Sequence, residues 1–335
     1  KTIMSDTVFR ALVVSKTDEK TYSREVTERK ISDLPEGEVL VRVRYSSLNF
    51  KDGLSCIGNP GVTRNYPHTP GIDASGEVAE SSDSRFKEGD SVIVTSYDLG
   101  MGTSGGFGQY IRVPADWVVP LPDGLTFKEA MIYGTAGYTA ALSVDALQKH
   151  GVAPEDGEIV VTGSTGGVGS VSVALLSHLG YTVAASTGKK EESEFLRGLG
   201  ASEIVSREEA NPESNKPLLR ERWAGAVDTV GGTTLASLLK ATKRGGAVAA
   251  TGLVASAELS TTVFPFILRG VSLLGIDSGF TPTKLRREIW SKLADVWKFP
   301  QLQKLTIDCT LEGLDPEIDK ILAGRQRGRV VVDLA

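Results

Sequence analysis

The most constraining feature of the sequence is a glycine-rich turn that joins an apolar run to a helix-like run. The turn lies within VVTGSTGGVGS (residues 160–170) and begins at Ser164, where the usual pattern of such turns has glycine. We expect Gly166 to let the backbone approach a pyrophosphate and Gly169 to let strand and helix pack closely. The start of the helix offers free N–H groups and the positive end of its dipole to the phosphates. The turn therefore predicts a dinucleotide-binding site; the alternative is a turn whose glycines serve packing alone.

Apolar strand-like runs alternate with helix-like runs through the middle of the chain. The six strand-like runs are EIVVTG (158–163), YTVAAST (181–187), SEIVS (202–206), GAVDTVG (225–231), GAVAATG (246–252) and VSLLGIDS (271–278). Continuous apolar strands that alternate with helices are typical of a parallel sheet covered on both faces. The pattern predicts the α/β class, with a doubly wound Rossmann sheet.

The first part of the chain has a different character. Residues 39–49 alternate apolar and polar side chains with period two, and residues 75–81 and 90–97 are similar, as in half-buried strands. We expect a β-rich first domain over residues 1–126 and the Rossmann domain over 127–278. Residues 279–335 contain a helix-like and a strand-like run, and we expect them to return to the first domain.

Composition narrows the partners and the compartment. The chain has 37 Lys and Arg against 42 Asp and Glu, a net charge of −5, which argues against nucleic acid or an anionic membrane as the main partner. No run reaches the ~18 apolar residues of a membrane span, and KTIMSDTVFR at the start lacks the apolar core of a signal peptide. With two cysteines in all, a disulfide framework is excluded and we expect a cytoplasmic protein. The partner that we expect is a small-molecule substrate.

The same counts limit metal chemistry. The sequence has two cysteines and three histidines, and it contains neither CxxC nor HExxH. A four-cysteine zinc site is therefore impossible, and we expect no metal site.

The end of the second Rossmann strand bears on which dinucleotide is bound. An NAD site usually has an acidic residue there, on the ribose 2′-hydroxyl. Here the strand ends in Ser186, Thr187, Gly188 and Lys189, followed by Lys190. Hydroxyls and lysines suit a 2′-phosphate, and Arg207 at the end of the next strand is expected to clamp it. We therefore predict NADP; the alternative is that both lysines are solvated and pair with Glu191 and Glu192.

Seven stretches along the chain carry a resemblance to a known family. They are SSLNFKDGL (46–54), PGIDASGEV (70–78), RFKEGD (85–90), GTAGYTAALSV (134–144), VTGSTGGVGS (161–170), GAVDTVGG (225–232) and PFILRGVSLLGIDS (265–278). In this order they resemble the medium-chain dehydrogenase/reductase superfamily over nearly the whole chain. The likeness is strongest to its zinc-free quinone oxidoreductase branch and, within it, to the acrylyl-CoA reductase group.

The resemblance implies a GroES-like substrate domain in the first part of the chain, completed by the tail, with the nicotinamide held between the domains. It also implies NADP contacts at matched motif positions. These are Phe50, Thr165, Gly166, Gly167, Val168, Thr187, Gly188, Lys189, Arg207, Leu253, Ile267 and Ser278. Phe50 is a departure, because the family usually has a tyrosine there. Members of the family have an asparagine near the C-terminus, and the matching position here is Gly324. We therefore do not expect a cofactor contact at Gly324.

The resemblance also bears on zinc. The positions at which zinc-dependent relatives ligate their catalytic metal correspond here to Asn49, Ile72 and the region of Gly134 and Thr135. None of these residues is a cysteine or a histidine. We therefore expect hydride transfer to proceed without a Lewis acid.

A zinc-free NADPH site suggests reduction of an activated C=C bond. Charge then develops on the carbonyl oxygen, which needs a hydrogen-bond donor, and the α-carbon needs a proton, which water could supply. We predict Asn49, Lys51 and Asp52 as candidate catalytic residues. The alternatives are that Asn49 braces the turn, that Lys51 is solvated or faces the cofactor, and that Asp52 anchors the turn through backbone N–H groups.

We expect an enoyl thioester such as acryloyl-CoA as the acceptor. A quinone, or a small enone or enal, is the second candidate, and an NADPH-binding protein without turnover is the third. The sixth strand-like run, VSLLGIDS, is apolar and would lie at the edge of the Rossmann sheet. An exposed apolar edge invites pairing with another chain, so we predict a homodimer; the alternative is a monomer in which the tail helix covers that edge.

Overall fold

The computed structural model describes residues 6–335, and the chain divides into two compact units. Unit 1 comprises the chain up to Thr135, Gly279–Asp295 and the chain from Thr306 onward. Unit 2 comprises Ala136–Ser278 and Val296–Leu305. Residues 127–135 therefore group with the first part of the chain, and a ten-residue piece of the tail, 296–305, groups with unit 2. The functional assignment of the two predicted domains stays a prediction.

Unit 2 is built on a six-stranded sheet in which every neighbouring pair is parallel. Its strands are β8 (Ile159–Val161), β9 (Val183–Ser186), β10 (Glu203–Val205), β11 (Trp223–Asp228), β12 (Thr242–Ala250) and β13 (Ser272–Gly275). They lie in the order β10-β9-β8-β11-β12-β13. This is the order of a doubly wound Rossmann sheet, and it confirms the predicted fold. The order reverses between β8 and β11, which is where such sheets bind ligands beyond the carboxyl ends of their strands.

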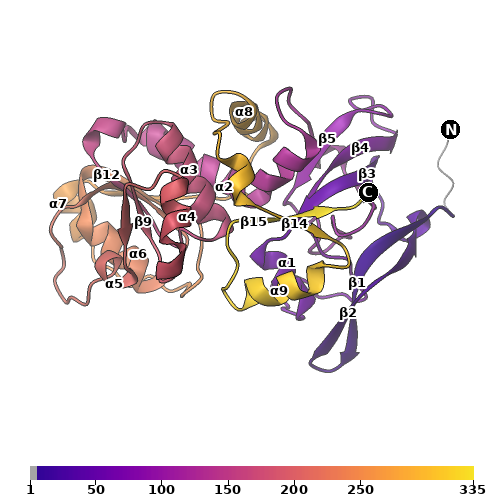
Figure 1. Ribbon diagram of the computed structural model, residues 1–335, viewed down its shortest axis with the longest axis horizontal. Helices are drawn as coiled ribbons and strands as arrows, with labels where there is room; N and C mark the ends of the chain where they lie inside the picture. Colours follow the sequence, from indigo (N-terminus) through magenta and orange to yellow (C-terminus); the bar gives the residue numbers. More distant parts are fainter. Residues whose placement is uncertain (1–5) are drawn as a thin grey trace. The chain divides into compact units, whose positions relative to one another are not determined.

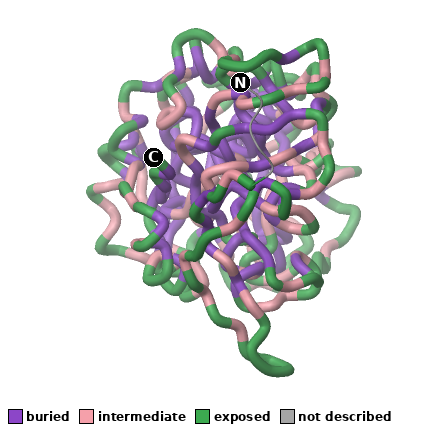
Figure 2. The backbone as a smooth tube through the Cα atoms, turned by 90° about the vertical axis from the view of Figure 1, so that its right-hand side faces the viewer, coloured by how far each residue is buried: buried purple, intermediate pink, exposed green. Residues whose placement is uncertain are grey.

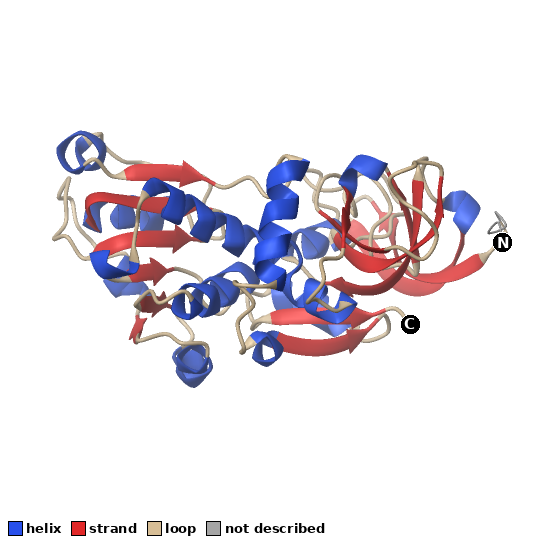
Figure 3. Cartoon of the chain, turned by 90° about the horizontal axis from the view of Figure 1, so that it is seen from above, coloured by secondary structure: helices blue, strands red, loops and turns tan. Residues whose placement is uncertain are grey.

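Helices lie against this sheet (Figure 3). They are the second part of α2 (Phe127–His150), α3 (Gly167–His178), α4 (Ser193–Gly198), α5 (Arg207–Ala210), α6 (Gly232–Ala241) and α7 (Phe264–Arg269), with short 3-10 turns at Pro154–Asp156, Lys190–Glu192 and Leu302–Leu305. The strands are buried because helices cover them, which explains their continuous apolar sequence.

Unit 1 contains a seven-stranded sheet and a two-stranded ribbon. The sheet comprises β3 (Val39–Ser47), β4 (Asp73–Ser81), β5 (Ser91–Thr95), β6 (Tyr110–Val113), β7 (Val118–Pro120), β14 (Thr306–Thr310) and β15 (Arg329–Asp333). Its order is β14-β15-β3-β4-β5-β7, and β6 pairs with β3. The yellow β15 therefore lies beside β3, and β14 lies beside β15, although about 280 residues separate β3 from β15 in the chain (Figure 1).

The ribbon of unit 1 pairs β1 (Val8–Asp18) with β2 (Thr21–Lys30). The helices of this unit are α1 (Phe50–Cys56), α8 (Thr283–Ala294), α9 (Leu314–Leu322) and the first part of α2, with 3-10 turns at Ile31–Asp33 and Ala115–Trp117. Along β3, Val41 and Val43 are buried and Arg42 between them is exposed, as the period-two pattern predicts, but Leu40 is also buried because it packs in a second core cluster with Phe9 and Ile31.

The buried stretches of backbone are purple in Figure 2, and the core side chains come from both strands and helices. In the part of the chain that the structure describes, no helix combines the length and the apolar character needed to cross a membrane.

Candidate active site

The glycine-rich turn of unit 2 leads from β8 into α3. Gly163 has a positive φ of 59°. A Cβ atom at Gly169 would collide with the carbonyl oxygen of Gly163, so only glycine lets the helix start approach the strand end. This is the close packing that the sequence predicts for Gly169. At Gly166 a Cβ atom would meet nothing closer than 3.4 Å, and no side chain caps the first N–H groups of α3. The turn thus leaves space in front of free donors, which suits a pyrophosphate.

Ser164 takes the place of a glycine without disturbing the turn. Its Oγ donates to the carbonyl oxygens of Val161 at 2.7 Å and Ser186 at 2.9 Å, and the side chain is buried. The hydroxyl therefore joins the ends of β8 and β9. The sequence indicates Ser164 as part of the site, but its side chain serves the framework.

The end of β9 meets the start of α5, as expected for neighbouring parallel strands. The Arg207 guanidinium lies against the Cα atom of Gly188: a Cβ atom there would stand 2.5 Å from Cζ and 2.9 Å from Nη2 of Arg207. Thr187 Oγ1 accepts a hydrogen bond from the Lys189 N–H at 2.9 Å. Ser186, Thr187, Gly188, Lys189 and Arg207 thus form one group at this edge of the sheet.

The electrostatics of this group favour an anion. Burial lowers the pKa of Lys189, and the neighbouring Arg207 lowers it further, while Glu192 and Glu191 raise it. The two glutamates therefore stabilise the charged form of Lys189, as the predicted alternative of a lysine–glutamate pair requires. Arg207, however, forms no ion pair within residues 6–335. Two cationic side chains held close together are stabilised when a dianion such as a phosphate binds between them.

The other predicted cofactor contacts lie on more exposed segments. Leu253 follows β12 and is 65% exposed, and Ile267 on α7 is 69% exposed. Ser278 is half-buried at the end of unit 2. Phe50 is the first residue of α1 in unit 1 and is also exposed. The geometry leaves these four side chains accessible, and their role stays a prediction.

A buried polar cluster of unit 1 contains two of the three candidate catalytic residues. Its members are Ser47, Asn49, Asp52, Asp73, Thr135 and Arg329. Asp73 is its centre, because its carboxylate accepts from Ser47 Oγ at 2.7 Å, from Asn49 Nδ2 at 2.7 Å and from the Thr135 N–H at 2.9 Å. Arg329 Nη2 lies 3.7 Å from the same carboxylate.

Asp52 anchors the turn before α1. Its carboxylate accepts from the backbone N–H groups of Asn49 at 2.7 Å, Ile72 at 2.9 Å and Gly71 at 3.2 Å. Burial and the nearby charge of Asp73 raise the pKa of Asp52 to about 7, against the lowering effect of these hydrogen bonds. This geometry is the anchoring role that we predicted as the alternative to catalysis.

The amide of Asn49 is used within the cluster. Nδ2 donates to Asp73 and lies 3.3 Å from the Ser47 carbonyl oxygen, while Oδ1 accepts from Arg329 Nη1 at 3.2 Å. The side chain therefore braces the turn and has its donors directed into the protein. Lys51, in contrast, is exposed on the first turn of α1. Of the three candidates, Lys51 is the one whose side chain is directed outward.

Two members of the cluster, Arg329 and Asp73, are not among the site residues that the sequence predicts. The Arg329 guanidinium is buried, and Nε and Nη1 donate to the carbonyl oxygens of Ile132 at 3.0 Å and Leu48 at 3.1 Å. Burial lowers its pKa, while Asp73 and Asp52 raise it. The one available signal was an arginine at the start of the apolar run RVVVD, where a buried strand was expected.

The cluster also determines the path of α2. The helix is kinked at Gly134, whose φ is 52° and ψ is −158°. A Cβ atom at Gly134 would stand 2.5 Å from Ser47 Oγ and 2.6 Å from Arg329 Nη2, and it would collide with Asp73. Only glycine fits between these groups, and Thr135 follows directly with its N–H and hydroxyl on Asp73.

The residues of this cluster do not suit a catalytic zinc. At the positions where the family resemblance places metal ligands, the chain has Asn49, Ile72 and the region of Gly134 and Thr135. The Arg329 guanidinium already supplies a positive charge within hydrogen-bond distance of Asn49. Within residues 6–335, no group of three or more His, Cys, Asp and Glu side chains could hold a metal ion.

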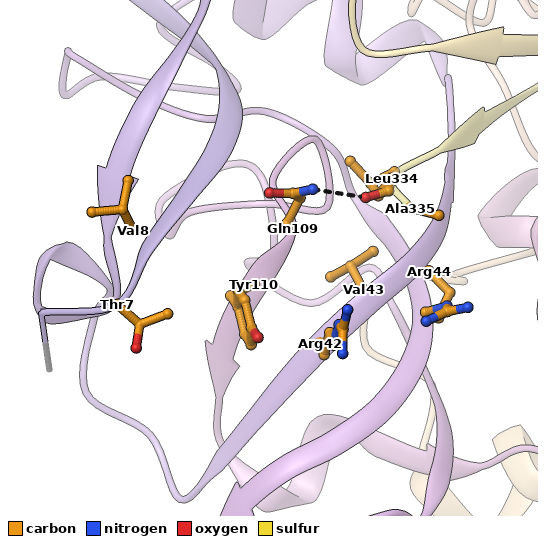
Figure 4. A pocket seen from close by; sticks show the side chains of 9 residues that line it. All are labelled: Thr7, Val8, Arg42, Val43, Arg44, Gln109, Tyr110, Leu334 and Ala335. Atoms are coloured by element: carbon orange, nitrogen blue, oxygen red, sulfur yellow. Dashed lines mark hydrogen bonds between the residues drawn. The ribbon is translucent and has the colours of Figure 1, made fainter. Parts of the chain in front are cut away.

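Two cavities of unit 1 lie away from these residues. One, of about 270 Å³, is lined by strands β1, β3 and β6 and by Leu334 (Figure 4). Gln109 Nε2 donates to the Leu334 carbonyl oxygen at 3.1 Å at its side. The other, of about 480 Å³, lies beside β14 and β15. Neither is lined by a predicted site residue.

Comparison with protein families gives two matches along the chain. Residues 35–123 match the alcohol dehydrogenase GroES-like domain, and residues 167–296 match the family described as zinc-binding dehydrogenase. The first match lies in unit 1 and the second lies mostly in unit 2.

Individual relatives match nearly the full chain. Acrylyl-CoA reductase AcuI of Ruegeria pomeroyi is 49% identical over 330 residues, which cover 98% of this chain and 99% of the relative. Protein YhfP of Bacillus subtilis, which carries the provisional name of a quinone oxidoreductase, is 48% identical over 331 residues, with the same coverage.

Two solved structures extend the comparison. The structure of YhfP with NAD bound has a TM-score of 0.95 and covers 98% of this chain and 100% of its own. The yhdH oxidoreductase of Salmonella enterica in complex with NADP is 44% identical with a TM-score of 0.94, covering 97% of this chain and 100% of its own.

Proposed function

Because the chain belongs to the medium-chain dehydrogenase/reductase family, in the branch of quinone oxidoreductases and acrylyl-CoA reductases, we propose that it is an NADPH-dependent reductase of activated C=C bonds, with an enoyl-CoA such as acryloyl-CoA as its acceptor. The observation that carries the cofactor assignment is the contact between Gly188 and the Arg207 guanidinium. The names of the relatives support the reaction class.

The residues of unit 2 suit NADP better than NAD. No acidic side chain lies among Ser186, Thr187, Gly188 and Lys189, where an NAD site places its ribose-binding carboxylate. A 2′-phosphate would instead be bound by Arg207 and Lys189. One relative was solved with NAD and another with NADP, so the preference of this chain must come from its own residues at this edge.

The glycine-rich turn is the second part of the proposed cofactor site. We assign the pyrophosphate to the backbone of Thr165, Gly166, Gly167 and Val168 at the start of α3, where space and free donors coincide. Phe50, Leu253, Ile267 and Ser278 are the further proposed contacts. NADPH, when bound, supplies the hydride.

Of the chain's own residues, Lys51 is the proposed donor to the acceptor. As the β-carbon is reduced, negative charge develops on the carbonyl oxygen, and an ammonium group stabilises it. Lys51 is exposed on α1, while Asn49 and Asp52 fix the turn from which it projects. We therefore propose that Asn49 and Asp52 act as positioning residues and that water supplies the proton to the α-carbon.

A screen of NADPH oxidation tests this proposal. The acceptors are acryloyl-CoA, crotonyl-CoA, a quinone and a small enal, each at several concentrations. We expect the highest kcat/KM with acryloyl-CoA. A higher value with the quinone or the enal would establish the second candidate function, and oxidation with none of the acceptors would leave an NADPH-binding protein without turnover.

The role of Lys51 is tested separately with Lys51→Met and Lys51→Arg. We expect Lys51→Met to lower kcat with little change in KM for NADPH, and Lys51→Arg to restore part of it, because the positive charge is kept. An unchanged kcat in Lys51→Met would exclude Lys51 as the donor.

We also propose a homodimer through the edge of the six-stranded sheet. β13 pairs with β12 on one side and is the last strand in the order. Leu273 on this strand is 38% exposed, and Ile267 and Val263 nearby in the chain are 69% and 61% exposed. Pairing with the same strand of a second copy would cover this apolar edge.

A further inference from the structure

The turn after β5 holds two successive residues in a conformation that side chains rarely adopt. Ser96 has a φ of 62° and Tyr97 a φ of 52°, and within residues 6–335 they are the non-glycine residues with positive φ. Such a conformation costs free energy and persists where the surrounding structure fixes it. The turn is therefore held in place by its contacts.

The first set of contacts connects the turn to the polar cluster around Asp73. The Ser96 N–H donates to the Ile72 carbonyl oxygen at 2.8 Å, and Ser96 Oγ lies 2.9 Å from Thr135 Oγ1. Thr135 in turn donates to Asp73, which accepts from Asn49. The strained turn thus directly adjoins the residues that fix α1 and Lys51.

The second set of contacts holds the Tyr97 ring. The backbone N–H of Tyr97 donates to the Gly279 carbonyl oxygen at 3.2 Å. The buried Arg286 places Cζ 4.4 Å from the ring centroid and donates to the carbonyl oxygens of Thr95 at 3.1 Å and Gly279 at 3.2 Å. Arg286 therefore fixes both the turn and the segment that starts at Gly279.

Three aromatic rings meet at this point. Tyr97 is stacked with Trp117, with centroids 5.4 Å apart and an angle of 6° between the rings, and Phe280 meets Tyr97 edge-on at 6.2 Å. We call Tyr97, Trp117 and Phe280 the aromatic platform. Tyr97 and Trp117 are half-buried, whereas Phe280 is 71% exposed. Phe280 also follows Ser278, a proposed cofactor contact, by two residues.

We propose that the aromatic platform binds a planar ring of the acceptor molecule, with Phe280 as the specificity-determining residue. A ring on a rigid segment offers stacking surface at little cost in conformational entropy, and an exposed phenylalanine beside two held rings provides that surface. The planar ring has two sources: the adenine of a CoA thioester, or the ring of a quinone. The inference rests on the proposed function, since it concerns the acceptor of that reaction.

The experiment compares three substrates and three variants. Acryloyl-CoA carries the adenine, acryloyl-pantetheine lacks it, and 1,4-naphthoquinone carries its own ring. Phe280→Ala removes the ring, Phe280→Leu keeps apolar bulk without a ring, and Phe280→Trp keeps an aromatic face. Unchanged melting temperatures establish that the variants fold, and calorimetric titration with CoA and with naphthoquinone measures binding without turnover.

We expect Phe280→Ala and Phe280→Leu to lower kcat/KM and binding about tenfold for a ring-bearing substrate, with acryloyl-pantetheine unchanged and Phe280→Trp close to wild type. A loss confined to acryloyl-CoA identifies adenine as the ring, and a loss with naphthoquinone identifies the quinone. Equal losses with all three substrates, or no loss, would overturn the proposal. If the wild type reduces none of them, the proposed function fails, and the two titrations still decide whether the platform binds rings.

Discussion

Substituting Gly188 by alanine should change cofactor preference without changing any charge. The new methyl group would stand 2.5 Å from Arg207 Cζ and 2.9 Å from Nη2, so the guanidinium must move. Gly188 is exposed and its φ is not positive, so alanine fits the backbone and little else is disturbed. We expect an unfolding free energy within about 0.5 kcal/mol of the wild type.

The size of the effect follows from the bond that would be lost. A charge-assisted hydrogen bond between a guanidinium and a phosphate contributes about 1.5–3 kcal/mol. Displacing Arg207 should therefore raise the KM for NADPH by roughly tenfold to a hundredfold. NADH has no 2′-phosphate, so its KM should stay close to the wild-type value.

A double-mutant cycle gives the decisive measurement. KM values for NADPH and NADH are determined for the wild type, Gly188→Ala, Arg207→Ala and the double variant. If alanine at 188 acts through Arg207, the double variant binds NADPH no more weakly than Arg207→Ala alone. Additive losses in the cycle, or an equal rise in KM for NADH, would refute this reasoning.

Three further outcomes are expected. Incubation with a chelator should leave activity and Tm unchanged, because the chain has five Cys and His residues in all and residues 6–335 hold no cluster of His, Cys, Asp and Glu that suits a metal ion. Stoichiometric zinc in elemental analysis would contradict this. Leu273→Lys should convert a dimer to monomers in light scattering, with Val8→Lys as the control on an exposed residue of unit 1, and a monomeric wild type would disprove the dimer. Gly134→Ala should lower the unfolding free energy by about 3 kcal/mol, since it adds a collision to an unfavourable φ. Gly151→Ala is its control, with φ of 101° and open space around it, and an equal loss in both would show that the collision contributes nothing.

The parts of the fold that depend on local sequence were predictable. All six Rossmann strands fall within the predicted runs or overlap them. The glycine-rich turn follows the end of β8, and β9 ends at Ser186, the first of the residues predicted to bind the 2′-phosphate. Apolar runs and glycine turns are local signals, and the connection rules of parallel sheets then bring the strand ends together. These rules place the segments that hold Gly188 and Arg207 at the same edge of the sheet, after the neighbouring strands β9 and β10.

The polar cluster of unit 1 could not be predicted in this way. Asp73 and Arg329 are separated by 256 residues, and no local pattern pairs a carboxylate at the start of one strand with an arginine at the start of another. The sequence predicts Asn49 as a candidate hydrogen-bond donor to the acceptor, but its partners Asp73 and Arg329 are distant in the chain and direct its amide into the protein. The strained turn at Ser96 and Tyr97 likewise has no glycine or asparagine to signal it.

The position of Arg329 has a consequence for the order in which the protein is made. Ribosomal synthesis completes residues 136–278 of unit 2 before it reaches β15, so the Rossmann sheet is available for folding while unit 1 still lacks two strands. During that interval Asp73 is without the guanidinium that lies 3.7 Å from it in the finished protein, and β3 has an open edge where β15 will pair. The sheet of unit 1 is thus the last to be completed during synthesis, and a nascent chain stalled before residue 329 would expose that edge to other chains and to chaperones.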